Sequence, residues 1–172
     1  LSTSINSLTD GYNDASSVGL GTGALANDDG TTNSNTAVGT DSLNTNTSGH
    51  SNSAMGRNAL YDNTTGYQNT ASGYLALSSN TTGTHSTAVG SRALKDNTTG
   101  YSNTASGSYA LQTNTTGGSN TAIGLKALRY NTTGGNNTAT GNYALYKNTT
   151  GSSNTATGKE ALYFNTTGTK NT

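Results

Sequence analysis

Few side chains in this sequence could perform acid–base, nucleophilic or metal chemistry. Its 172 residues include two histidines, eight acidic residues and no cysteine. His50 and His85 lie in the same variable part of a repeated unit, where a solvated corner residue is the ordinary interpretation. The run Asp28-Asp29-Gly30 offers the oxygen ligands that Ca²⁺ prefers, but no acidic ladder follows it, as one does in calcium-binding solenoids. We therefore predict no catalytic residue, no metal site, no cofactor and no enzymatic activity.

Two further motifs suggest ligand or glycan chemistry. Gly19-Leu20-Gly21-Thr22-Gly23 has the composition of a phosphate-binding loop, but no helical pattern follows it, and it fits a degenerate first repeat better. The Asn-Thr-Thr tripeptide, Asn-Thr-Ser in its first copy, is a glycosylation acceptor in every strict repeat. We interpret these asparagines as bare structural residues, with glycosylation as the alternative. They are Asn46, Asn63, Asn80, Asn97, Asn114, Asn131, Asn148 and Asn165.

Tyrosine is the side chain best suited to binding a partner at the surface. Nine of the ten tyrosines fall in variable positions of the repeat, and the invariant positions carry none. An exposed aromatic ring can stack on a sugar, although the interpretation we favour is that tyrosines pack over neighbouring repeats and stiffen the structure. The candidate surface contacts are Tyr67, Tyr74, Tyr101, Tyr109 and Tyr143.

The elements that position these residues follow from a strict period of 17. The common unit is close to N-T-A-x-G-x-x-A-L-x-x-N-T-T-G-x-x, and an irregular first copy occupies residues 17–34. Two rows of glycine recur at this spacing. The first row is Gly39, Gly56, Gly73, Gly90, Gly107, Gly124, Gly141 and Gly158; the second is Gly49, Gly66, Gly83, Gly100, Gly117, Gly134, Gly151 and Gly168.

A unit of this length and composition predicts an all-β fold, a parallel β-solenoid (β-helix or β-roll) of about nine coils. The unit is too short for a helical hairpin, and Asn, Thr and Gly disfavour helix. We expect T-A-x and A-L-x-x to form strands, and Gly and Asn to form corners because both tolerate positive φ. Coils stacked at about 4.8 Å would give a rod roughly 43 Å long. Residues 1–16 are expected to be a leading segment or cap, residues 17–172 the solenoid, regular from residue 35 and truncated at residue 172.

Stacking places like residues over like, so that each conserved position becomes a column. Asparagine amides carry both donors and an acceptor and can bond along a column. The apolar column is Leu43, Leu60, Leu77, Leu94, Leu111, Leu128, Leu145 and Leu162. Alternation along a strand predicts that neighbours such as Ala93 and Leu94 face opposite sides. One apolar row would then point outward, and such a stripe normally marks an interface. We therefore expect identical chains to assemble, most simply as a parallel homotrimer.

Composition excludes other partners. Eight basic residues balance eight acidic ones, so we expect no nucleic-acid partner. No apolar run approaches the roughly 20 residues needed to cross a bilayer, so this segment is not expected to insert into a membrane. The sequence starts without Met and stops at the first two residues of a further repeat, which indicates a piece of a longer protein.

The repeat resembles two known groups of proteins. N-T-A-V-G at residues 35–39 and N-T-A-I-G at residues 120–124 are similar to the S-V-A-I-G motif of trimeric autotransporter adhesin heads, which are trimers of parallel β-rolls. The longer unit ending in N-T-T-G looks like repeats in the shafts of phage and phage-like tail fibres. The resemblance covers about residues 17–172, although adhesin-head coils are shorter. It implies a structural shaft or spacer that supports attachment to a host surface, located outside the cell on a virion or bacterial surface.

Three other functions fit parts of the pattern. An adhesin head would itself bind host glycan or matrix protein, and the variable tyrosines are the residues that would do so. An ice-binding solenoid would order water on flat threonine rows, but a regular T-x-T strand face is absent from the sequence. A disordered polar linker would show no regular structure at all.

Overall fold

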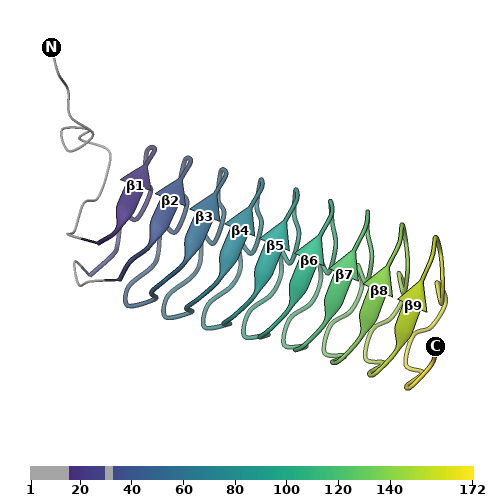
Figure 1. Cartoon of the computed structure of the whole chain (residues 1–172). Helices are drawn as coiled ribbons and strands as arrows, with labels where there is room; N and C mark the ends of the chain where they lie inside the picture. Colours follow the sequence, from purple (N-terminus) through teal and green to yellow (C-terminus); the bar gives the residue numbers. More distant parts are fainter. Residues whose placement is uncertain (1–15, 30–32) are drawn as a thin grey trace, which may run out of the picture.

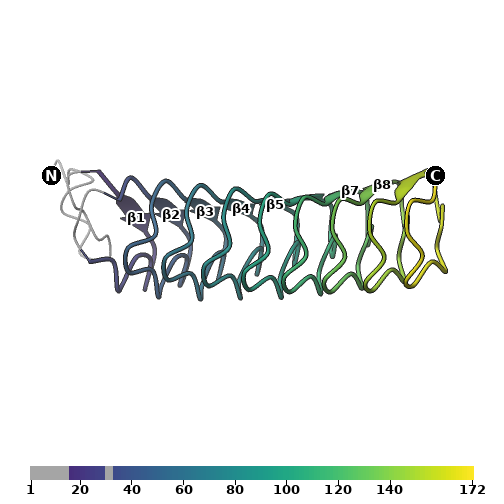
Figure 2. The same cartoon turned by 90° about the horizontal axis from the view of Figure 1, so that it is seen from below.

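The computed structural model describes residues 16–29 and 33–172, which form a stack of similar coils with one short strand each (Figure 1). The nine strands of these described ranges lie in one parallel sheet in sequence order, with β1 and β9 at opposite ends (Figures 1 and 2). The expected all-β parallel solenoid is confirmed. The strands are β1 (Val18–Leu20), β2 (Thr36–Val38), β3 (Ser53–Met55), β4 (Thr70–Ser72), β5 (Thr87–Val89), β6 (Thr104–Ser106), β7 (Thr121–Ile123), β8 (Thr138–Thr140) and β9 (Thr155–Thr157).

The strand register repeats without slippage. From β2 onward each residue pairs with the residue 17 positions later, so that Ala37 pairs with Ala54 and Ala54 with Ala71. The first coil is one residue longer, because Val18 pairs with Thr36. Of the expected leading segment, only Ser16 belongs to the described residues. Gly30 of the acidic run and Thr31-Thr32 of the first coil's loop also lie outside them.

The predicted second strand, A-L-x-x, is wrong. This stretch forms a turn, and each leucine of the column has a left-handed backbone, with φ between 48° and 52° from Leu43 to Leu162. A bend between the two residues removes the alternation that a strand would impose, so Ala93 and Leu94 both point inward and are fully buried. The expectation that one of the two rows faces outward is therefore also wrong.

The two glycine rows serve different physical needs. In the first row φ lies between 121° and 140°, a region that only glycine occupies readily. The second row has no positive φ. There a Cβ at Gly66 would lie 2.5 Å from the carbonyl oxygen of Gly83 in the next coil, so the second row is required by close packing. The prediction that the asparagine rows sit at positive-φ corners is wrong too, because these rows have ordinary φ among the described residues.

Candidate functional site

The first candidate site is the interior, where one column of asparagines is bonded from coil to coil. Each side-chain Nδ2 donates to the Oδ1 of the asparagine one coil earlier, at 2.8–2.9 Å from Asn63 to Asn165. The same Nδ2 donates to the carbonyl oxygen of the glycine three residues later, at 2.9–3.1 Å. These amides are fully buried from Asn46 to Asn148.

A second asparagine column converges on the same glycine carbonyls. Its members accept the backbone N–H of their successor through Oδ1, as Asn35 does from Asn52 at 2.9 Å. Their Nδ2 donates to the carbonyl 14 residues later, so the Gly66 oxygen accepts from both Asn52 at 2.9 Å and Asn63 at 3.0 Å. The second glycine row therefore joins the two columns, a link that the sequence pattern did not reveal. The column is Asn35, Asn52, Asn69, Asn103, Asn120, Asn137 and Asn154, with Ser86 in one coil.

Ser86 interrupts this arrangement at one level. Its hydroxyl accepts the backbone N–H of Asn103 at 3.2 Å and donates to the Thr84 carbonyl at 3.2 Å. It does not reach the glycine row, so the Gly100 carbonyl keeps only the bond from Asn97. The coil of Ser86 is thus held by one amide fewer than its neighbours.

Burial of the asparagine amides determines whether the glycosylation motifs are accessible. A glycan is attached through Nδ2. In the first column that atom is buried from Asn46 to Asn148, and from Asn63 onward it already donates two hydrogen bonds. Asn46 through Asn148 therefore cannot carry a glycan in this fold. One further acceptor tripeptide, Asn136-Asn137-Thr138, was missed because its asparagine lies in a variable position, and Asn136 is exposed.

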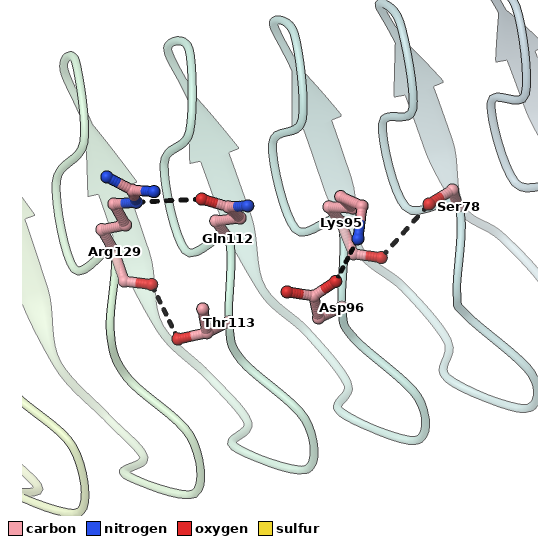
Figure 3. Close-up of polar contacts among 6 residues, drawn as sticks. All are labelled: Ser78, Lys95, Asp96, Gln112, Thr113 and Arg129. Atoms are coloured by element: carbon pink, nitrogen blue, oxygen red, sulfur yellow. Dashed lines mark hydrogen bonds and ion pairs between the residues drawn. The ribbon is translucent and has the colours of Figure 1, made fainter.

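The outer surface carries short-range contacts that differ from coil to coil. Figure 3 shows Lys95 paired with Asp96 at 2.6 Å, and Arg129 Nε donating to Gln112 Oε1 at 2.9 Å in the preceding coil. Thr113 Oγ1 donates to the Arg129 carbonyl at 2.9 Å. All of these residues come from the connecting backbone, not from the strands.

The five candidate tyrosines lie on three rows of the repeat: Tyr67 and Tyr101 share one, Tyr109 and Tyr143 share another, and Tyr74 lies on a third. Tyr67 stacks on His50 with ring centroids 4.9 Å apart and meets His85 edge-on at 5.2 Å. Tyr74 and Tyr101 are exposed, and the ring of Tyr101 lies over Gly118 of the next coil.

The other two candidates, Tyr109 and Tyr143, share a row with two cations. The guanidinium of Arg92 donates to the Tyr109 hydroxyl at 2.7 Å and lies between the rings of Tyr74 and Tyr109. These contacts join adjacent coils, in keeping with tyrosines that pack along the rod.

The largest aromatic group lies in the last coils and was not predicted. Tyr146 has ring centroids 5.0 Å from each of Tyr130, Tyr143 and Tyr163, and Tyr163 meets Phe164 at 4.8 Å. Three cations border the group. Lys126 lies 5.1 Å from the Tyr143 ring centroid, Arg129 5.1 Å from that of Tyr130, and Lys147 5.0 Å from that of Phe164.

Hydrogen bonds in this group shift two pKa values. The bond from Lys126 Nζ to the Tyr143 hydroxyl, at 3.0 Å, raises the pKa of Lys126. A hydrogen bond with Tyr146 raises the pKa of the Tyr130 hydroxyl. At neutral pH Lys126 is therefore charged and Tyr130 is protonated.

The strand face is a further exposed surface. The first and third residues of the strands are mostly exposed, while the central alanine is buried. The third position is apolar in several coils, at Val38, Met55, Val89 and Ile123. A T-A-T sequence occurs only in β8 and β9, which gives an irregular surface for ordering water.

No group of three or more His, Cys, Asp or Glu side chains close enough to bind a metal ion is present in residues 16–29 and 33–172. In the same ranges there is no helix with the length and hydropathy to cross a membrane. Comparisons with protein-family models, with curated proteins and with solved structures give no match.

Proposed function

We propose that this chain is a structural shaft, a rigid spacer in an extracellular fibre of a phage, a phage-like particle or a bacterial surface, and has no enzymatic role. The observation that carries the proposal is the separation of constant and variable residues. The buried asparagine, leucine and glycine positions repeat in nearly every coil, whereas the outside changes. Such a chain sets a length by the number of its coils, as expected of repeat proteins whose units contact only their neighbours.

The shaft is proposed to assemble as a parallel homotrimer. The apolar residues available for this contact are those at the third strand position, Val38, Met55, Val89 and Ile123, since the leucine and alanine columns are buried within each chain. Val38→Lys combined with Val89→Lys should give folded monomers in sedimentation experiments, while Ser91→Lys on a connecting turn should leave the oligomer intact. A wild-type chain that sediments as a folded monomer contradicts the trimer.

The spacer role is tested by changing the number of coils. Spectroscopic labels at the two ends should move apart by about 4.8 Å per inserted coil, in direct proportion to coil number. In the parent fibre, deletion of two whole coils, residues 87–120, should shorten the shaft and preserve attachment to the host. A separation that grows only with the square root of coil number would indicate a flexible linker, and loss of attachment would favour an adhesin.

A second candidate is an adhesin in which the rod itself binds a host glycan or protein. The aromatic and cationic group around Tyr146 favours it, because exposed aromatic rings and charged donors are typical of saccharide and protein contacts. Binding of the isolated segment to a glycan array would support this function.

A further inference from the structure

Within residues 16–29 and 33–172, tyrosine rings contact one another only in the aromatic group of the last coils. Tyr146 is the centre of that group. Its ring centroid lies 5.0 Å from those of Tyr130, Tyr143 and Tyr163. Tyrosines of earlier coils have neighbours of other kinds, as Tyr67 does between two histidines. The group therefore brings together phenols that the rest of the rod keeps apart.

Tyr130 and Tyr146 come from adjacent coils and are joined through both backbone and side chain. The backbone N–H of Tyr130 donates to the carbonyl oxygen of Tyr146 at 3.2 Å. Their rings meet edge-on at an interplanar angle of 75°, and the hydroxyl groups interact, which raises the pKa of Tyr130. Because Tyr130 is exposed, a reagent in solution can reach this pair.

Phenols that touch in this way can be joined by one-electron oxidation. When each hydroxyl loses one electron and its proton, the unpaired spin spreads to the ring carbons next to the C–O bond. One such carbon from each ring then forms a C–C bond, and the hydrogens on these carbons move to the oxygens, which restores both phenols. The pair gives up two electrons and two protons in all, and these reduce one hydrogen peroxide to two water molecules. Because the coils hold the rings together, this coupling is favoured over coupling between chains.

We propose that Tyr130 and Tyr146 are a modification site, at which a peroxidase that uses hydrogen peroxide forms a dityrosine bond between adjacent coils. The chain has no cysteine, so a disulfide within it cannot supply such a covalent bond. A dityrosine would close a loop over residues 130–146 and restrict the unfolded chain, as a disulfide does. The chemistry is independent of the shaft function, and only its use as a brace within a rigid rod rests on that proposal.

The test is oxidation of the intact chain, at low protein concentration, by a haem peroxidase and hydrogen peroxide. The fraction that stays uncoupled to other chains should gain dityrosine fluorescence, which no tryptophan obscures in this sequence. Its mass should fall by two hydrogen atoms. The oxidised protein should also unfold at a higher urea concentration than the untreated protein.

Peptide mapping identifies the residues that are joined. Trypsin releases residues 130–147 as one peptide, because it cleaves after Arg129 and Lys147. A bond between Tyr130 and Tyr146 should lie within that peptide and suppress the fragment ions from the backbone between them. A bond to Tyr163 would instead join two separate peptides.

Conservative variants separate the pair from the other tyrosines. Tyr146→Phe keeps the ring and removes the reactive hydroxyl, so it should lose most of the fluorescence and the shift in the urea midpoint. Tyr130→Phe should lose the bond within the 130–147 peptide. Tyr101→Phe is the matched control, because Tyr101 is exposed and has no tyrosine neighbour, and its yield should equal that of the wild type.

Three outcomes overturn the proposal: no dityrosine within single chains, a bond that leaves Tyr130 free, or a wild-type yield from Tyr146→Phe. Circular dichroism of each variant checks that the solenoid is intact before oxidation. The number of coils tests the shaft function separately. A chain that fails here, but whose length still grows in proportion to coil number, loses the modification site and keeps its function as a shaft.

Discussion

The inside and the outside of the rod use the same residue types for different purposes. Asn114 is buried and bonded to two neighbours, whereas Asn142 is exposed and its side chain has no comparable role. Leu111 is fully buried, whereas Leu125 is an exposed residue on a turn. Position within the coil, and not residue type, therefore decides what a side chain contributes to stability. Matched pairs of substitutions can measure the difference.

The leucine pair, Leu111 and Leu125, should show the largest difference in the free energy of unfolding. Leu111→Ala removes a buried side chain from the apolar column and should lower the free energy of unfolding by about 2–5 kcal/mol. Leu125→Ala makes the same chemical change at an exposed site and should stay within about 0.5 kcal/mol of wild type. Urea titrations followed by circular dichroism measure both; equal effects would show that the column is not the core.

The asparagine pair, Asn114 and Asn142, should show the second largest difference in stability. Asn114→Ala removes donors to Asn97 Oδ1 at 2.8 Å and to the Gly117 carbonyl at 2.9 Å, and removes the acceptor of Asn131 Nδ2. Leaving buried polar groups without partners should cost about 2–4 kcal/mol. Asn142→Ala is the control and should be nearly neutral. If Asn114→Ala were tolerated equally well in thermal denaturation, the amide column would not be a source of stability.

Two adjacent glycines, Gly117 and Gly118, should differ in how well they tolerate substitution by alanine. A Cβ at Gly117 would lie 2.5 Å from the Gly134 carbonyl oxygen in the backbone of the next coil. Gly117→Ala should therefore destabilise by about 1–3 kcal/mol. At Gly118 the nearest atoms belong to the movable ring of Tyr101, and equivalent coils carry Tyr67 or Ser152, so Gly118→Ala should change the melting temperature little. A reversed order would contradict the role given to the second glycine row.

The smallest expected effect is an increase in stability. Ser86→Asn restores the missing member of its column and gives the Gly100 carbonyl its second donor, which should stabilise the fold by about 1 kcal/mol. Ser91→Asn is the control, because an equivalent coil already has Asn142 there, outside the columns. An unchanged or lower midpoint for Ser86→Asn in urea would mean that the second bond to the glycine carbonyl contributes nothing.

The sequence predicts the fold well because a strict period leaves few ways to stack like residues over like. The T-A-x strands, the parallel register and the positive φ of the first glycine row all follow from it. The left-handed leucines do not, because leucine disfavours that conformation and only the closed coil imposes it. The double use of the Gly66 carbonyl also depends on side chains 14 and 3 residues away that meet only in three dimensions.

The candidate site was harder to predict for a related reason. Asn136 and the row of Thr113, Tyr130 and Lys147 lie in positions that vary between coils, so periodicity gives them no signal. The individual tyrosines could be selected by type, but the group around Tyr146 depends on ring positions within and between coils. The change from Asp62 and Asp96 to Tyr130 and Lys147 is visible in the sequence only when residues separated by multiples of 17 are compared.

The direction of the bonds between coils has a mechanical consequence. The ladder bonds and the amide bonds within each column join one coil to the next, so they run along the rod. Tension applied to the two ends pulls these bonds apart one coil at a time instead of shearing many at once. Each detached coil frees 17 residues, about 56–61 Å of extended chain. When it is stretched in a force spectrometer, the rod should lengthen in equal steps, one for each coil that detaches. It should therefore absorb mechanical work gradually instead of breaking at once.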